Sequence, residues 1–584
     1  MKNQGLLFSI FTVLLILINK SYAQAPNIEW QNCLGGTSLE DFTKMKQTSD
    51  GGYIIAMETA STDGDVIGNH DVDGEGPFTS DIWVVKLNSL GNIEWQKCLG
   101  GTEEENITSV NITNDGGYII AGETFSTDGD VIGLHGFTWD AWVIKLSNSG
   151  VIQWQKCLGG SDVEELSDLV ITNDGGFIIS GVTSSNDGDV SGNHGASDIW
   201  LVKLTNSGVI QWQKCLGGSD YDFIGTNDPF LLTNEGGYLL TGMTYSNDGN
   251  VSGNHGSEDV WIVNLNNLGI INWQKCLGGS QGEGLSQILQ TTDGGFIVAG
   301  ETVSDDGDAS GLHGTMPDAW IVKLNNLGVL SWQKCIGGTD SDEATFIHET
   351  PDGGYIFAGE TSSNNWDISG FQGNSDFLIV KMNSIGNIVW QKCLGGSGTD
   401  AGISSFIKDG NDYVLAGSTF SNDGDVSGNH GSVDVWIVKI NETGSILWQK
   451  CLGGFDDEGA ETLLKTNDGG YILSAHPNSN SGDVTGNMGM DSWIVKLKNT
   501  QSSNVNNLEK EISILVFPNP TSGNVSISGL KPSEQNKVIL YTITGEKITE
   551  FDNTESEMEL NLEMYAPGIY FIHCDGEVLR VIKK

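Results

Sequence analysis

A seven-residue pattern, Trp-Gln-x-Cys-[Leu/Ile]-Gly-Gly, recurs eight times along this 584-residue chain and constrains its fold more than any other feature. Its copies begin at Trp30, Trp95, Trp154, Trp212, Trp273, Trp332, Trp390 and Trp448, so that successive copies lie 58 to 65 residues apart. The first step is the longest because it contains an insertion around residues 71–80. A period of this length is typical of repeat architectures, in which each unit is one small supersecondary structure.

Each repeat contains four stretches with the composition of β-strands. Examples are LSDLVIT from Leu166, GYIIAGET from Gly117, DAWVIKL from Asp140 and VIQWQKC from Val151. Aliphatic and aromatic runs between Gly, Asn and Asp clusters indicate strands, and no stretch of the mature chain has a convincing helical period. Four short antiparallel strands per repeat predict an all-β fold, an eight-bladed β-propeller over residues 28–497.

The two ends of the repeat array indicate how the ring closes. The array opens with a lone fourth strand at Ile28–Cys33 and ends with a third strand at Asp491–Leu497. We expect the first segment to complete the last blade, because this pairing removes an open sheet edge. An open β-solenoid is the alternative, but it would need capping units that neither end resembles.

The segment K-L-N-x-x-G-x-I-x-W, as in Lys86–Trp95, resembles the tryptophan-docking repeat of the quinoprotein alcohol dehydrogenase propellers. The resemblance implies eight blades in which this motif joins the third strand to the outermost fourth strand. It supports the fold alone. No quinone cofactor is expected, because the catalytic surroundings of that family have no residue-by-residue match in this chain.

The first 23 residues are predicted to be a signal peptide. Lys2 precedes an apolar stretch of 13 residues, Leu6–Ile18, and Ser21 and Ala23 fit the small-residue cleavage rule before Gln24. A retained membrane anchor is the alternative. No other segment is long and apolar enough to span a bilayer, so no transmembrane span is expected after cleavage.

The pattern changes after the repeats. Residues 498–511 are polar and read as a linker, and residues 512–584 alternate strand-like stretches with Pro and Gly turns, as in a small Ig-like β-sandwich. This segment resembles the type A C-terminal sorting domain of the type IX secretion system of Bacteroidota. The matching residues are Phe517, Pro518, Asn519, Pro520, Thr544, Gly545, Pro567, Gly568, Ile569, Tyr570, Lys583 and Lys584.

The sorting-domain resemblance implies passage through the periplasm and the outer membrane, with the type IX secretion machinery as a partner. It further implies a secreted or outer-membrane-surface location, with the sorting domain cleaved and the protein released or anchored. An unrelated small adhesive sandwich is the alternative.

The charge is strongly acidic, with 76 Asp and Glu against 28 Lys and Arg and a net charge of −48. Such a surface makes nucleic acid and anionic membranes poor partners. It favours exposure to cations instead.

A loop of the general form T-x-S-x-D-G-D-V-x-G-x-H-G recurs between the second and third strands of the repeats, with Asn250 in place of the second aspartate in unit four. The loops of units six and eight are degraded and keep Asp367 and Asp483. Two carboxylates around a Gly, in a loop rich in carbonyl groups, suit a hard cation, so calcium is the predicted metal. The downstream Asp of the D-x-W strand is a further possible ligand. The alternative, that Asp-Gly-Asp folds the loop by side-chain-to-backbone bonds, stays open. The predicted ligands are Asp63, Asp65, Asp128, Asp130, Asp187, Asp189, Asp248, Asp306, Asp308, Asp423 and Asp425.

Two other residue types recur with the repeat. One histidine stands in each of six loops, and we expect a hydrogen bond that closes the loop rather than a zinc site. Eight cysteines share one position on the outermost strand, too far from one another for disulfides, so we expect eight buried free thiols. The histidines are His70, His135, His194, His255, His313 and His430, and the cysteines are Cys33, Cys98, Cys157, Cys215, Cys276, Cys335, Cys393 and Cys451.

In a four-stranded blade, these loops and the acidic crossovers between blades lie on one face. No motif of nucleophilic, phosphate-binding or zinc chemistry stands out. Unit six departs most from the repeat, with Phe377 in place of the tryptophan and Asn-Asn-Trp-Asp from Asn364. We therefore predict a non-catalytic, ligand-binding or adhesive propeller whose acidic rim meets an extracellular glycan or protein. A polysaccharide hydrolase or lyase and a structural surface component are the alternatives.

Overall fold

The computed structural model describes residues 24–70, 79–225 and 230–499 and, nearer the C-terminus, residues 515–517, 521–528, 537–542, 547–552, 557–574 and 577–584. The predicted signal peptide and nearly all of the predicted linker lie outside these residues. The chain forms two compact units, residues 1–500 and 501–584. Within the described ranges every regular element is a β-strand.

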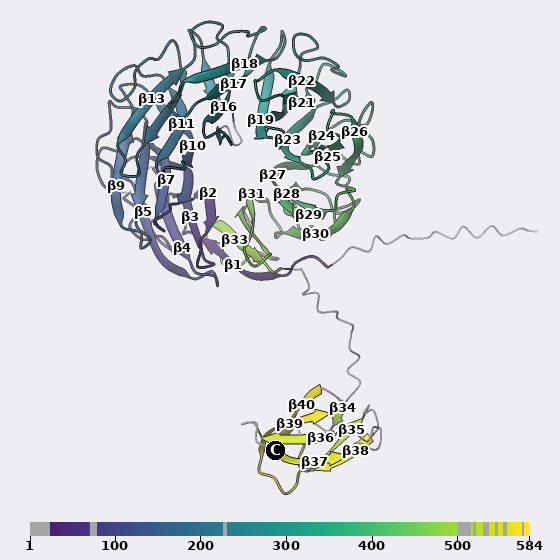
Figure 1. Cartoon of the computed structure of the whole chain (residues 1–584). Helices are drawn as coiled ribbons and strands as arrows, with labels where there is room; N and C mark the ends of the chain where they lie inside the picture. The colour runs from purple at the N-terminus through teal and green to yellow at the C-terminus, as the bar shows by residue number, and fades with distance from the viewer. Residues whose placement is uncertain are drawn as a thin grey trace, which may run out of the picture. The chain divides into compact units, whose positions relative to one another are not determined.

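The strands of the first unit form eight sheets in a ring, numbered here as blades 1 to 8 (Figure 1). Blade 1 holds β2 (Glu40–Gln47), β3 (Tyr53–Thr59), β4 (Asp81–Leu87) and β5 (Ile93–Leu99); blade 2 holds β6 (Glu105–Ile112), β7 (Tyr118–Thr124), β8 (Asp140–Leu146) and β9 (Ile152–Leu158). Blade 3 holds β10 (Glu164–Ile171), β11 (Phe177–Thr183), β12 (Asp198–Leu204) and β13 (Ile210–Leu216). In blade 4 the inner strand is in two pieces, β14 (Asp222–Ile224) and β15 (Phe230–Leu232), followed by β16 (Tyr238–Thr244), β17 (Asp259–Leu265) and β18 (Ile271–Leu277).

The second half of the ring repeats this order. Blade 5 holds β19 (Glu283–Gln290), β20 (Phe296–Thr302), β21 (Asp318–Leu324) and β22 (Leu330–Ile336); blade 6 holds β23 (Asp342–Glu349), β24 (Tyr355–Thr361), β25 (Asp376–Met382) and β26 (Ile388–Leu394). Blade 7 holds β27 (Asp400–Asp409), β28 (Asp412–Thr419), β29 (Asp434–Ile440) and β30 (Ile446–Leu452). Blade 8 combines β31 (Glu458–Lys465), β32 (Tyr471–Pro477) and β33 (Ser492–Leu497) with β1 (Ile28–Leu34) from the start of the array.

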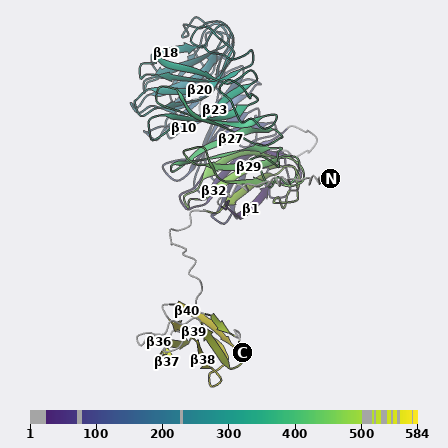
Figure 2. The same cartoon turned by 90° about the vertical axis from the view of Figure 1, so that its right-hand side faces the viewer.

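The pairing of β1 with β33 confirms the predicted closure. The two strands run antiparallel from Ile28 opposite Leu497 to Leu34 opposite Ser492. The same arrangement is visible in the two views of the ring, where β1 lies at the outer side of blade 8 (Figures 1 and 2). The eight antiparallel sheets establish an eight-bladed β-propeller.

The outer-strand tryptophans join neighbouring blades, as the tryptophan-docking resemblance implies. The ring of Trp30 lies against Gly91 in the turn between the third and fourth strands of the next blade, and a Cβ on Gly91 would lie 2.7 Å from that ring. Gly91 also has a φ of 82°. Both facts require glycine there, because a side chain would be strained and would displace the indole. The same contact recurs from Trp95 on Gly150 to Trp390 on Gly444.

A second set of tryptophans, those of the D-x-W strands, fills the blade cores. Trp142 is fully buried, and its Nε1 donates to Gln155 Oε1 on the outer strand at 2.8 Å. The interpretation of unit six needs a correction: Leu378, not Phe377, stands in the register of the tryptophan, opposite Cys393. The Phe377 ring lies 5.0 Å from that of Trp436 in the next blade. It therefore fills the junction between blades.

The eight repeat cysteines are free thiols, as predicted. Seven of the eight repeat cysteines are buried, whereas Cys33 on the closing strand is half-buried. Burial raises the pKa of these thiols, as at Cys157, where the pKa is about 12. They behave as small apolar side chains.

The second unit contains two sheets. One has the order β34 (Leu515–Phe517), β35 (Asn524–Ser528), β38 (Glu557–Asn561), and the other β37 (Lys547–Asp552), β36 (Lys537–Thr542), β39 (Gly568–Cys574), β40 (Glu577–Lys583). Val525, Leu560, Leu540 and Ile572 belong to one shared core to which both sheets contribute. This matches the small β-sandwich expected here.

Candidate functional site: the loop face of the propeller

The D-G-D loops lie on the face where the chain crosses from one blade to the next, and they clamp that crossover. Asp187 Oδ1 accepts the backbone N–H of Ser161 at 2.7 Å, and the Asp189 N–H donates to Gly159 O at 2.8 Å. Gly188 between them has a φ of 64°, and a Cβ atom added to this glycine would lie only 2.4 Å from Gly159 O. The same side-chain bond is made by Asp63, Asp128, Asp248, Asp306 and Asp423.

The second aspartate of the loop faces the preceding blade. Asp130 pairs with Lys97 at 3.1 Å, and Asp308 pairs with Lys275 at 2.7 Å. Asp425 accepts a hydrogen bond from the Gln372 side chain at 3.0 Å. Asp65 donates its backbone N–H to the preceding crossover. The first aspartate side chain of a loop therefore accepts a backbone N–H of the crossover, and the second aspartate side chain pairs with side chains of the preceding blade.

This geometry favours the side-chain-to-backbone interpretation of the loop without testing calcium binding. Across the described ranges, one group of three metal-ligating side chains comes together, and it contains none of the predicted calcium ligands. Calcium therefore stays a prediction.

Calcium held by these loops would raise the melting temperature of the propeller by several degrees relative to protein in excess chelator, because a ligand that binds only the folded state stabilises it. Differential scanning fluorimetry with calcium and with chelator measures the difference. Changing Asp187 and Asp189 together to Asn should reduce this difference in melting temperature by the contribution of one loop. Equal melting temperatures would contradict the prediction.

The loop histidines close their loops, as expected. His135 Nδ1 lies 2.7 Å from Asp140 Oδ2, and the same oxygen accepts the His135 backbone N–H at 2.9 Å. Equivalent pairs are His70–Asp81, His194–Asp198, His255–Asp259, His313–Asp318 and His430–Asp434. The aspartate before the tryptophan is therefore a partner of its histidine.

Below the loops lies a ring of buried carboxyl pairs that the sequence interpretation missed. The side chains of Asp140 and Glu164 both lie close to Gly159. A Cβ atom added to this glycine would lie 2.6 Å from Asp140 Oδ1 and 2.3 Å from Glu164 Oε2. Asp140 Oδ1 is buried and has no hydrogen-bond partner. Burial raises the pKa of both carboxyl groups, and the charge of Asp140 adds to the rise at Glu164. The pairs are Asp81/Glu105, Asp140/Glu164, Asp198/Asp222, Asp259/Glu283, Asp318/Asp342, Asp376/Asp400, Asp434/Glu458 and Asp491/Glu40.

A signal for these pairs is present in the sequence. In all eight copies of the Trp-Gln-x-Cys-[Leu/Ile]-Gly-Gly pattern, an acidic residue follows the last glycine by four positions, as Glu164 follows Gly160. The acidic crossover therefore contributes one carboxyl group to the interior of the junction, and not only to the rim.

Blade 6 presents a different surface. Trp366 occupies the position of the central glycine in the D-G-D loop, with a φ of 55° and 72% of its surface exposed. The loop still clamps its crossover, because Asn365 Oδ1 accepts the Thr339 N–H at 3.0 Å and the Asp367 N–H donates to Gly337 O at 3.2 Å. Trp366 therefore replaces glycine in a loop that keeps both hydrogen bonds to its crossover.

The Trp366 ring rests on an imidazole. Its centroid lies 5.3 Å from that of His313, which Asp318 holds at 2.7 Å and whose Nε2 lies 3.6 Å from Asp367 Oδ2. His313 and Asp367 also line a groove of about 520 Å³ between the outer strands of blades 5 and 6, together with Lys334. Trp366 therefore precedes a residue that lines this groove and contacts another, and its ring is exposed.

Residues 515–584 match the family model of the secretion system C-terminal sorting domain. The C-terminal unit is a secretion sorting domain. It marks the chain as cargo of the type IX secretion system, delivered through the periplasm to the outer-membrane surface or the extracellular space. In the sorting domain, Tyr570 follows Gly568 on β39 and donates its hydroxyl to Ala566 O at 2.7 Å. Pro518, Asn519, Pro520 and Gly545 lie outside the described residues.

Solved structures similar to this chain include PorZ, an essential bacterial surface component of the type IX secretion system of Porphyromonas gingivalis. PorZ is 12% identical, with a TM-score of 0.33 over 93% of this chain and 70% of PorZ. The Neurospora crassa Pan2 WD40 domain is 11% identical, with a TM-score of 0.33 over 65% of this chain and 86% of that domain. A puromycin hydrolase is 9% identical, with a TM-score of 0.37 over 78% of this chain and 60% of the hydrolase.

These similarities are too distant to carry an activity over to this chain. No curated protein matches it. A search of the described part of the chain finds no helix of the length and apolarity needed to cross a membrane.

Proposed function

We propose that the exported propeller is a non-catalytic carbohydrate-binding module, and that Trp366 and the groove beside it contact the sugar. The observation that carries the proposal is the conformation of Trp366. Seven other loops have glycine at this position, with φ between 61° and 68°. A bulky residue with positive φ is strained, and such strain collects at functional sites.

The surroundings of Trp366 suit a sugar. An exposed indole offers a flat apolar face to the C–H face of a pyranose ring, and a tryptophan side chain loses little conformational entropy on binding. Asp367 and Lys334 in the adjoining groove provide an acceptor and a donor for hydroxyl groups. Delivery of the chain to the outside of the cell puts this face among extracellular glycans.

A catalytic role on polysaccharide, the main alternative, would need two carboxyl groups facing the substrate. The carboxyl groups that approach each other at the blade junctions are buried beneath the loops. Their position favours binding over hydrolysis. A purely structural role at the cell surface would not require Trp366. Replacing this residue therefore distinguishes a structural role from glycan binding.

Changing Trp366 to Gly should weaken glycan binding while leaving the propeller as stable or more stable. The change removes an aromatic anchor worth about tenfold or more in affinity. It also relieves a backbone strain of about 1 kcal/mol. Binding of the mature protein to a glycan array, followed by affinity measurement on the best glycan, tests both effects together with thermal melting.

The matched control is Phe137→Ser, which removes another exposed aromatic side chain, 90% exposed, from the loop of blade 2. This variant should bind like the unaltered protein. Equal binding by the Trp366→Gly variant, or no binding to any glycan by the unaltered protein, would overturn the proposal.

A further inference from the structure

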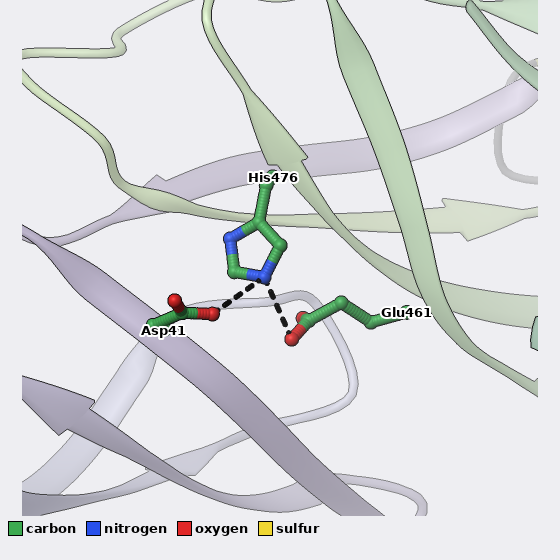
Figure 3. Close-up of side chains that lie close together, drawn as sticks. All are labelled: Asp41, Glu461 and His476. Atoms are coloured by element: carbon green, nitrogen blue, oxygen red, sulfur yellow. Dashed lines mark ion pairs between the residues drawn. The ribbon is translucent and has the colours of Figure 1, made fainter. Parts of the chain in front are cut away.

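The junction that closes the ring contains a group of side chains found at none of the other described junctions. Asp41 on β2, Glu461 on β31 and His476 on β32 point toward one another (Figure 3). His476 Nε2 lies 2.9 Å from Asp41 Oδ1 and 2.8 Å from Glu461 Oε1. One ligand atom from each residue lies within 4.8 Å of the others. The group joins the last blade to the first.

Other blades have different residues at these positions. Glu461 is the bulged residue of its inner strand, where Thr108, Ser167, Ser286 and Thr345 stand in blades 2, 3, 5 and 6. The residue in the register of His476 is Glu58, Glu123, Val182, Met243, Glu301, Glu360 or Ser418 in the other seven blades. The repeat therefore supplies neither the imidazole nor the glutamate, and the closing junction has acquired both.

The backbone holds the two carboxylates in place. The Phe42 N–H donates to Asp41 Oδ1 at 2.7 Å, and the Thr43 N–H donates to Glu461 Oε1 at 3.0 Å. Phe42, the residue after Asp41, adopts a φ of 54°, a strained conformation for an aromatic residue. Glu461 Oε2 is buried and has no hydrogen-bond partner. One carboxylate oxygen of the group thus has unused capacity for a ligand.

We propose that Asp41, Glu461 and His476 bind one divalent transition-metal ion, with zinc as the best fit, which fastens the last blade to the first. An imidazole with two carboxylates is a ligand set that zinc accepts, whereas calcium and magnesium favour oxygen alone. Zinc bonds of about 2.0–2.2 Å separate tetrahedral ligand atoms by about 3.3 Å. The observed separations therefore need to widen by about half an ångström.

Solvent reaches the group, since the side chains of His476, Asp41 and Glu461 are 34%, 30% and 16% exposed. An ion can therefore enter the folded ring and leave a coordination position for water. Without an ion, a protonated His476 donates to one carboxylate or the other. A metal would replace that proton and bind the three strands at once.

The test is zinc titration of the mature protein, freed of metal by chelator, by isothermal calorimetry. We expect one zinc per chain bound through this group, and a rise of several degrees in the melting temperature. The His476→Gln variant should no longer bind this zinc ion. The matched control, His194→Gln, alters a loop histidine that pairs with Asp198 in blade 3, and this variant should still bind one zinc per chain.

A second measurement keeps the proposal testable if His476→Gln fails to fold. Cobalt(II) added to the unaltered protein should give the intense visible absorption of a four- or five-coordinate nitrogen and oxygen site, and Asp41→Asn should weaken it. Absence of stoichiometric zinc binding would overturn the proposal. So would zinc binding that survives in both His476→Gln and Asp41→Asn.

Discussion

Deleting residues 24–34 is expected to lower the free energy of unfolding of the propeller by about 5 kcal/mol, because apolar burial and a strand ladder are lost together. The deletion removes β1 and leaves β33 as an exposed edge in blade 8. Leu34 is buried at this junction, and Gln31 accepts a hydrogen bond from Trp493 Nε1 at 2.6 Å. An exposed edge of this kind also promotes association between chains.

The closing strand binds two blades, which makes its removal more damaging than the loss of an ordinary outer strand. It pairs with β33 in blade 8, while its Trp30 lies 5.8 Å from Tyr53 in blade 1, measured between ring centroids. Trp30 Nε1 also donates to Ser89 O at 3.1 Å in blade 1. Without β1, both contacts are lost.

Chemical denaturation of the mature and shortened proteins measures the difference. A synthetic peptide of residues 24–34 should restore most of the lost stability by adding the strand back. A peptide with Trp30→Ala and Leu34→Ala serves as the control and should restore little. Unchanged stability of the shortened protein would mean that β1 does not close the ring in solution.

The propeller should be more stable near pH 5 than at pH 8, because its buried carboxyl groups favour the protonated form. Glu105 is the best example: burial raises its pKa to about 7, against lowering by hydrogen bonds from Thr124, Ser126 and Gly101. Asp81, held by His70, faces Glu105 from the preceding blade and adds to the rise. Burial also raises the pKa of Glu123 to about 7 and that of Asp376 to about 6.

The sign follows from proton linkage. Between the ordinary carboxyl pKa and about pH 7, the folded protein binds more protons than the unfolded chain at these sites, so stability falls as the pH rises. Each carboxyl group contributes up to about 3 kcal/mol to this fall. Below about pH 4 the opposite effect begins. Asp115 in a Gly-Gly turn has its pKa lowered to about 2, mainly by a hydrogen bond from Thr113, so its stabilisation is lost on acidification.

Denaturation with urea at pH 5, 6, 7 and 8 tests this expectation. Glu105→Gln keeps the size of the side chain and removes the titration, so it should gain stability at pH 8 relative to pH 5. Glu103 is an exposed acid of the same crossover, and Glu103→Gln serves as the matched control that should leave the pH profile unchanged. A stability that rises steadily from pH 5 to 8 would contradict the prediction.

Most of the fold can be predicted from the spacing of the repeats. The Trp-Gln-x-Cys marker and the four strand-like stretches correctly predict eight blades and the pairing of the Ile28–Cys33 segment with the last blade. This succeeds because strand period, turn residues and closure all act over short distances or through identical units. The register of unit six was predicted wrongly, since Leu378 and not Phe377 replaces the tryptophan.

The candidate sites were less predictable. The acidic residues of the loops and crossovers look equivalent in the sequence. In the structure, Asp187 accepts the backbone N–H of Ser161, whereas Glu164 is buried beside Asp140. Such roles depend on which atoms of the neighbouring blade come within hydrogen-bond distance. The sequence predicts a degraded loop in unit six, whereas the loop around Trp366 keeps its hydrogen bonds to the crossover and presents the ring to solvent.

The number of blades, the sorting domain and the export route can be predicted from the amino-acid sequence, because they depend on local patterns that recur or match as linear segments. Which carboxyl groups are buried, and which side chains meet at the closing junction, follows only from how the chain folds. Asp41 and His476 are 435 residues apart in the chain, and no local pattern links them. Only closure of the ring brings them to 2.9 Å.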